Sequence, residues 1–195
     1  MLRLICKWAW LLFLLPVSAS AQDQGLWAYG CDHFLYGACF RIPNDISVTH
    51  TVPVDFGLHT FMREGHSVLT VYEGDAPGSP PSALTQSLEL KGNGYHLRGY
   101  IQHQGQSSRY VVIVDSARAG DMTLNLSGET NSLNDKNILA AILGGFRVCR
   151  FKQTRNDQVL VCPRSSDWGQ RLSSWVIGAR EDGVGAGMPQ VSEVR

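Results

Sequence analysis

Apolar and polar residues alternate with a period of two over most of the chain from residue 47 onward. Stretches with this pattern or a continuous apolar run cover residues 47–52, 58–63, 66–73, 84–90, 95–102, 109–115 and 122–126. Turn residues separate them, such as Glu64-Gly65 and the segment 74–82 with its prolines and glycines. Short strands at hairpin spacing predict a mostly β fold of antiparallel sheets and hairpins, sandwich- or barrel-like.

One stretch has the features of a helix. Asn134 or Asp135 can cap its N-terminus, residues 138–143 are apolar, and Gly144-Gly145 can end it. We therefore predict one short α-helix that covers a face or an end of the sheet. The segment around Trp168 and Trp175 fits either a strand or a helix. Residues 181–195 offer little to bury and are predicted to form a flexible tail.

The first 21 residues have the organisation of a cleavable signal peptide. Their parts are the basic residues Arg3 and Lys7, the apolar run 8–15, Pro16 and the small residues Ala19-Ser20-Ala21. The apolar run is short for a span of hydrocarbon, and no stop-transfer pattern follows, which disfavours an uncleaved anchor. We predict cleavage before Gln22, export to the periplasm, and a single domain over residues 22–180.

The cysteine pattern agrees with an oxidising compartment. Cys6 would leave with the leader, and the four remaining cysteines allow two disulfides in three pairings. We favour Cys31–Cys39 with Cys149–Cys162, since strands at 147–151 and 159–162 would place the second pair opposite each other. The alternative is metal ligation, but the spacings are not those of zinc sites. We expect no metal, no cofactor and no catalytic cysteine.

Composition narrows the classes of function further. The 195 residues include 17 basic and 17 acidic side chains, so the formal net charge is zero. A neutral chain lacks the charge that binding to a phosphate backbone requires, which argues against a nucleic-acid partner. Residues 22–145 carry net −5 and residues 146–180 carry net +5. The basic segment is either a surface for an acidic partner or an ordinary solvated hairpin face.

Motifs for catalysis are scarce. No G-x-S-x-G is present, the acidic residues are scattered, and no glycine-rich loop precedes a helix. The six histidines show no H-x-x-x-H or H-E-x-x-H spacing, and on alternating strands most should face solvent: His33, His50, His59, His66, His96 and His103. His59 and His66 are on paired strands, so folding could still join them in a site. We predict that the protein is not an enzyme.

Three loops could present residues to a partner: 75–82, 92–94 and 103–109. The third is the strongest candidate, because its polar side chains donate and accept hydrogen bonds and an apolar strand follows it. An ordinary hairpin turn is the alternative for the same residues. The predicted partner-binding residues are Gln104, Gly105, Gln106, Ser107, Ser108 and Arg109.

The leader, the four cysteines, the β pattern and the Gly105-Gln106-Ser107-Ser108 loop together resemble periplasmic immunity proteins. These proteins protect Gram-negative bacteria from their own type VI secretion cell-wall amidases. The resemblance implies that a Ser-bearing loop enters the active-site cleft of a peptidoglycan-degrading amidase effector. Ser107 and Ser108 would then contact the catalytic groups, with Gly105, Gln106 and Arg109 in support.

Other classes of function remain open from the sequence. A periplasmic lysozyme inhibitor would also plug a cleft with a loop. A carbohydrate- or peptide-binding module would use exposed aromatic residues instead. Candidates for such a surface are Trp27, Tyr29, Trp168 and Trp175. An enzyme on an unrecognised β scaffold is the third class.

Overall fold

The computed structural model describes residues 30–53, 55–75, 82, 84–92, 94–116, 123–153, 158–163 and 167–179. The side chains of 151–153, 158 and 159 are not among the described atoms. The predicted leader, 1–21, and the predicted tail, 181–195, lie outside these residues, as do Trp27 and Tyr29. No described helix has the length and apolar character needed to cross a membrane.

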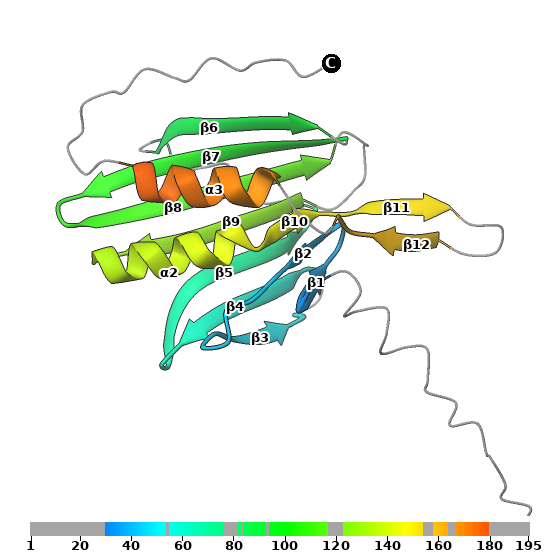
Figure 1. Ribbon diagram of the computed structural model, residues 1–195, viewed down its shortest axis with the longest axis horizontal. Helices are drawn as coiled ribbons and strands as arrows, with labels where there is room; N and C mark the ends of the chain where they lie inside the picture. Colours follow the sequence, from blue (N-terminus) through cyan, green and yellow to red (C-terminus); the bar gives the residue numbers. More distant parts are fainter. Residues whose placement is uncertain are drawn as a thin grey trace, which may run out of the picture.

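A seven-stranded antiparallel sheet forms the main layer (Figure 1). Its strands, in spatial order, are β3 (Ser47–Thr51), β4 (Gly57–Arg63), β5 (His66–Gly74), β9 (Thr123–Thr130), β8 (Ser107–Ser116), β7 (Tyr95–Gln104) and β6 (Thr85–Gly92). β3 and β6 are its two edges, so the sheet does not close into a barrel. The order consists of two three-stranded meanders, joined through the later strand β9.

The second layer lies on one face of this sheet and is made of helices and a smaller sheet, which gives a sandwich-like arrangement (Figure 1). The smaller sheet has the order β1 (His33–Leu35), β2 (Ala38–Phe40) and β10 (Phe146–Val148). The helices are α2 (Leu133–Gly144) and α3 (Asp167–Gly178). A separate hairpin pairs β11 (Arg150–Gln153) with β12 (Gln158–Val161). The mostly antiparallel β fold is thus confirmed.

Helix α2 begins earlier than predicted. Ser132 is the N-cap, and its hydroxyl accepts a hydrogen bond from the backbone N–H of Asp135 at 3.1 Å. The carboxylate of Asp135 in turn accepts from the Ser132 hydroxyl at 2.8 Å. Asn134 and Asp135, predicted as caps, therefore lie inside the helix. The predicted stop is confirmed, since Gly145 caps the C-terminus.

The segment around Trp168 and Trp175 is the helix α3, so the described chain holds two helices where the sequence predicted one. Its buried residues are Gly169, Leu172 and Val176, and the side chains of Leu172 and Val176, four apart, face the core. Trp175 rests on Gly99 of β7, where a Cβ would come within 3.2 Å of its ring. The helix packs this closely because Gly99 has no side chain.

The core lies between the two layers. Alternate residues of the large sheet face it, among them Phe61, Leu69, Val112 and Leu126, which are almost fully buried. The helices and the smaller sheet supply the opposite wall of this core: Phe40, Leu139, Ile142, Leu143, Phe146 and Leu172. The period of two in the sequence therefore marks the face that carries the second layer.

Both predicted disulfides are confirmed. Cys31 pairs with Cys39 at a Cα–Cα distance of 5.9 Å, and Cys149 pairs with Cys162 at 4.2 Å. The register of the β11–β12 hairpin explains the second pair. Arg150 is opposite Val161, so Cys149, which precedes Arg150, and Cys162, which follows Val161, come to lie opposite each other. Two disulfides indicate that the chain folds in an oxidising compartment.

Candidate functional site

The predicted partner-binding residues lie at the end of the longest hairpin, β7–β8. Both strands run further than predicted, since Gln104 pairs with Ser107 and only Gly105 and Gln106 remain as the turn. Gly105 has φ +61°, the positive value that a two-residue turn needs at its first central position. The expected loop is thus a tight two-residue turn, and both serines belong to strand β8.

Ser107 and Ser108 have different surroundings. The Ser107 hydroxyl donates to the backbone carbonyl of Gln104 at 3.0 Å across the turn. Ser108 is 5% exposed, and its hydroxyl lies 2.9 Å from His103 Nδ1. Its carbonyl also accepts from the hydroxyl of Thr130 in β9 at 3.4 Å. Ser108 therefore ties the hairpin end together and does not present its hydroxyl at the surface.

The groups available at this end are Gln104, Gly105, Gln106 and Arg109, which are all exposed. The β7–β8 turn lies on the left of Figure 1, at the end where α2 begins and α3 finishes. Lys136 of α2 donates to the backbone carbonyl of Ala179, which joins these two helix ends. The apolar side chains of Leu133 and Ile177 are 71% and 49% exposed there. We call these six exposed residues the hairpin-end surface: Gln104, Gly105, Gln106, Arg109, Leu133 and Ile177.

A second arrangement, absent from the sequence prediction, is a group of three histidines and one glutamate. It consists of His33 of β1, His50 of β3, His59 of β4 and Glu73 of β5, and we call it the His–Glu cluster. It forms where the smaller sheet packs on the β3–β4–β5 part of the large sheet (Figure 1). Antiparallel register places His50 directly opposite His59, and Gly57 opposite Glu73.

His59 is the centre of the cluster and is 2% exposed. Its Nε2 lies 3.0 Å from Glu73 Oε2, and its Nδ1 lies 2.8 Å from His33 Nε2. The ring of His50 stacks on that of His59, with centroids 4.1 Å apart and planes at 6°. The other carboxylate oxygen of Glu73 accepts from the backbone N–H of Tyr36 at 2.7 Å. Carboxylate and two imidazoles thus form a continuous hydrogen-bonded chain.

The cluster changes the protonation of its members. Burial, together with the nearby His59 and His50, lowers the pKa of His33 to about 4, and Glu73 offsets only part of this effect. Burial alone would raise the pKa of Glu73, but hydrogen bonds from His59 and from the Tyr36 backbone lower it below its usual range. At neutral pH, Glu73 is therefore a carboxylate and His33 a neutral imidazole.

Gly57 leaves a small space among these groups. A Cβ on this residue would lie 3.1 Å from His59 Nε2 and 3.4 Å from both Glu73 Oε2 and His50 Nε2. Three ligand-type atoms therefore lie around one point next to the backbone of β4, although they are not all within 4.8 Å of one another. Imidazole nitrogen and carboxylate oxygen are the donor types of transition-metal sites.

The sequence analysis considered a different pair, His59 and His66. The register separates them: His59 pairs with Val71, whereas the exposed His66 pairs with Arg63 near the turn. The expectation that most histidines face solvent is wrong, since His50 and His66 are exposed but the other four are partly or fully buried. The sequence did contain a signal for the pairing of His50 with His59. Once β3 and β4 are taken as neighbouring antiparallel strands, their register sets these two residues opposite each other. No such signal exists for His33, which reaches the cluster from another sheet.

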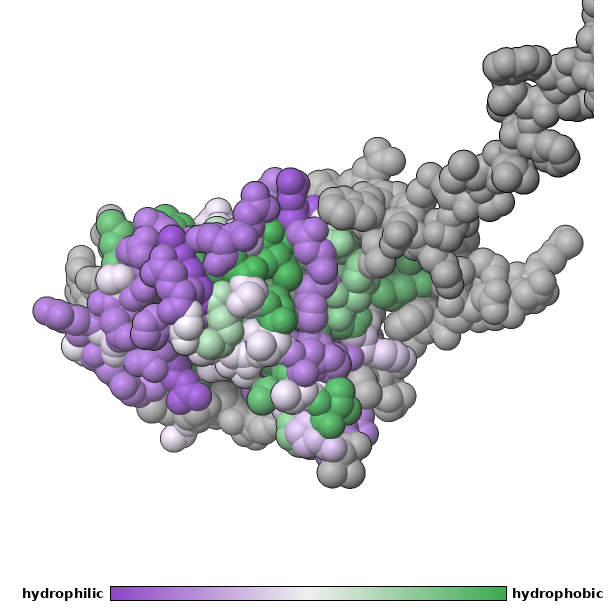
Figure 2. Space-filling model, turned by 90° about the horizontal axis from the view of Figure 1, so that it is seen from below, coloured by the Kyte–Doolittle hydropathy of each residue, from purple (hydrophilic) through white to green (hydrophobic). Residues whose placement is uncertain are grey.

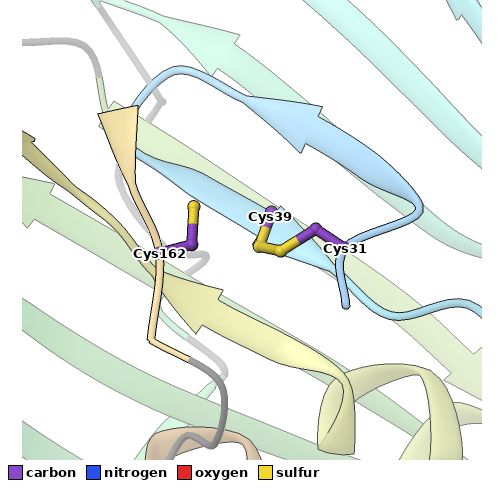
Figure 3. Close-up of side chains that lie close together, drawn as sticks. All are labelled: Cys31, Cys39 and Cys162. Carbon is purple, nitrogen blue, oxygen red and sulfur yellow. A yellow bond between two sulfur atoms is a disulfide. The ribbon is translucent and has the colours of Figure 1, made fainter. Parts of the chain in front are cut away.

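The sulfur atoms form a third arrangement. In the part of the chain that is described, the one set of three ligand-type atoms within 4.8 Å of one another is the sulfurs of Cys31, Cys39 and Cys162. Figure 3 shows Cys162 beside the Cys31–Cys39 bridge. All three are buried. As disulfide sulfurs they carry no thiolate, so the group is structural here.

The two aromatic candidates that the structure describes, Trp168 and Trp175, are packed rather than open. Trp168 and Trp175 are half-buried against the core, and Trp175 donates from Nε1 to the Ser87 hydroxyl at 2.9 Å. Its ring meets that of Tyr110 edge-on at 5.5 Å. A sugar platform needs an exposed ring face, which Trp175 uses for the sheet instead. Arg147 of the basic segment is also buried, at 7% exposed.

In comparisons with protein-family models, curated proteins and solved structures, none matches this chain.

Proposed function

We propose that this protein is an exported inhibitor that binds a peptidoglycan-degrading amidase effector, in the manner of a periplasmic immunity protein. The observation that carries the proposal is the end of the β7–β8 hairpin. It is a tight turn with exposed Gln104, Gln106 and Arg109, held by bonds on both strands. The leader predicted over residues 1–21 would deliver the chain to the compartment of such an enzyme.

The geometry revises which groups meet the partner. Ser108 is buried, so the inserting groups are the turn residues Gly105 and Gln106, flanked by Gln104 and Arg109. The amide side chains can donate and accept hydrogen bonds in a polar cleft. Because the turn is already ordered in the free protein, little conformational entropy is lost on binding.

Exposed apolar groups beside the turn support a protein partner over a small ligand. Leu133 and Ile177 belong to the hairpin-end surface and would be covered by an enzyme surface around its cleft. Interfaces commonly combine such apolar contacts with a polar centre that fixes the orientation. The turn would enter the cleft while the two apolar side chains contact the rim.

A serine-hydrolase reading of the His103–Ser108 pair finds less support. A nucleophile must reach the substrate carbonyl, but the Ser108 hydroxyl is beneath the hairpin end. It bonds to Nδ1 of His103, and its backbone carbonyl is fixed by Thr130. These contacts join β8 to its two neighbouring strands, β7 and β9, and are therefore structural.

The test measures dye release from labelled peptidoglycan by a panel of cell-wall amidases and lysozymes. Each enzyme is assayed alone and with increasing amounts of the protein produced from residue 22. We expect inhibition of at least one amidase, and no dye release by the protein alone. Inhibition of lysozymes only would support the lysozyme-inhibitor alternative, and dye release by the protein alone would overturn the proposal.

A matched pair of variants locates the surface. Gln106→Arg places a long charged side chain on the turn, and we expect at least about tenfold weaker inhibition. Gln170→Arg makes the same exchange at an exposed position of α3 and should inhibit like the natural chain. Equal inhibition by both variants would remove the hairpin-end surface from the proposal.

A further inference from the structure

We propose that His50, His59 and Glu73 bind a divalent transition-metal ion, with Zn²⁺ as the best match, in the space beside Gly57. This inference is independent of the proposed inhibition, because the two sites use different residues. His59 Nε2, Glu73 Oε2 and His50 Nε2 all lie 3.1–3.4 Å from the point where a Cβ of residue 57 would be.

Two of the three ligands already have the spacing of neighbours around a metal. His59 Nε2 and Glu73 Oε2 are 3.0 Å apart, which suits bonds of about 2.0–2.2 Å to one ion. The ligand atom of His50 is not within 4.8 Å of both others, so its exposed ring has to turn away from the stack on His59 to complete the set. Its position on the edge strand β3 also gives an ion a route from solvent.

The hydrogen-bond partners of His59 and Glu73 are of the kind that orient ligating residues in metal sites. The Nδ1 of His59 faces His33 Nε2 at 2.8 Å, and Glu73 Oε1 accepts from the Tyr36 backbone at 2.7 Å. Such outer contacts fix the tautomer and direction of a ligating ring and carboxylate. His33 and Tyr36 belong to the smaller sheet and its turn, so this segment supports the site without ligating.

Protons balance on binding. Without metal, the hydrogen bond to Glu73 requires a proton on His59 Nε2, and His59 Nδ1 accepts from His33 Nε2. With metal, the His59 proton is on Nδ1 and points to His33 Nε2, whose own proton has moved to Nδ1. In this exchange neither ring gains or loses a net proton, and each changes tautomer by exchange with water. Protons compete with the ion for the imidazole nitrogens, so binding weakens in acid.

The donor set also selects the kind of ion. Two imidazole nitrogens and one carboxylate oxygen suit Zn²⁺ and similar transition metals, whereas Mg²⁺ and Ca²⁺ prefer oxygen ligands alone. Three protein ligands leave a tetrahedral position for water. Figure 2 views the molecule from below Figure 1 and shows hydrophilic and apolar areas side by side on this face. His50 is itself exposed, so water can reach its ring.

The experiment uses tag-free protein from residue 22 with both disulfides formed. A thiol assay first confirms that no cysteine is free, because reduced Cys31, Cys39 and Cys162 would themselves bind zinc. Equilibrium dialysis with Zn²⁺ then gives the stoichiometry, and Co²⁺ absorption spectra report the ligand geometry. We expect one ion per chain and no binding of Mg²⁺ at the same concentration.

Two variants test the geometry without removing the buried His59. His50→Ala deletes the exposed ligand, and Gly57→Ala keeps all three ligands but fills the space among them. We expect each to weaken Zn²⁺ binding at least tenfold. The matched controls are His66→Ala, an exposed histidine outside the cluster, and Gly178→Ala, where a Cβ would meet nothing within 4 Å. Both controls should bind as the natural chain does.

Urea unfolding of every variant shows whether it is folded, so a loss of binding can be assigned to the site. The proposal is overturned if the natural chain binds no Zn²⁺, or if His50→Ala and Gly57→Ala bind it as well as their controls. A Co²⁺ spectrum with the charge-transfer bands of sulfur ligands would also contradict it, since it would place the ion on cysteines.

Discussion

Two neighbouring residues, Ser107 and Ser108, illustrate how one strand position changes the role of a side chain. Both are serines on β8, yet Ser108 points to the layer of helices and is 5% exposed, whereas Ser107 is half-buried at the turn. A period of two separates their faces. The sequence shows two adjacent serines, but only the start of β8 in the structure decides which of the two hydroxyls faces the core and which lies at the turn.

We predict that Ser108→Arg destabilises the fold and that Ser107→Arg does not. The first places an unpaired charge in a buried position and breaks the bond to His103, which should lower the free energy of unfolding by about 3 kcal/mol. The second should change it by about 0.5 kcal/mol or less. Urea unfolding followed by circular dichroism measures both. Equal stability of the two variants would contradict the described burial.

His33 and Glu73 should make stability fall in acid. The unfolded chain protonates His33 near its ordinary pKa of 6.5, but the folded chain does so only near 4. Between these values the unfolded state holds more protons, so the free energy of unfolding decreases as pH falls. The lowered pKa of Glu73 extends the decrease below its ordinary 4.5.

The measurement is the urea midpoint at pH 7.5, 5.5 and 4.5 in a metal chelator. We expect the natural chain to lose more stability over this range than His33→Gln, which cannot titrate at residue 33. His66→Gln, the exposed control, should follow the natural chain. A pH profile of His33→Gln that coincides with that of the natural chain would count against the lowered pKa.

At the scale of elements, hydrophobic alternation predicted the strands of the large sheet, and the spacing of Cys149 and Cys162 predicted their bridge. The register of β3 and β4 was also within reach of the sequence, and with it the pairing of His50 and His59. The sequence did not distinguish helix from strand for the segment that forms α3, because no strong capping residue bounds this short segment. Contacts between distant segments, such as His33 with His59, follow from packing of one sheet on another.

Ser132 offers a direct test of an element boundary. We predict that Ser132→Ala lowers the free energy of unfolding by about 1 kcal/mol, because the cap on the Asp135 N–H is lost. Ser174→Ala, on the exposed side of α3, is the control and should be neutral or slightly stabilising. Thermal and urea unfolding measure the difference. An unchanged free energy of unfolding in Ser132→Ala would contradict the assignment of Ser132 as the N-cap of α2.

At the scale of the molecule, each disulfide closes a short local loop, and the two pack in one buried group where the beginning of the described chain meets its late hairpin. We predict that replacing either pair by alanine lowers the free energy of unfolding by about 3 kcal/mol, as expected for loops of this length. The paired variants are Cys31→Ala with Cys39→Ala, and Cys149→Ala with Cys162→Ala. A thiol assay on the natural chain should find no reactive cysteine after residue 22.

The position of β9 has a consequence for how the chain is made. The strands up to residue 116 form two separate ribbons, β3–β4–β5 and β6–β7–β8, and each keeps an open edge until β9 enters between β5 and β8. Open edges invite pairing with other chains. A nascent polypeptide that ends before Thr123 is therefore exposed to self-association, and the pairing of β9 with both β5 and β8 covers these two inner edges and joins the ribbons into one sheet.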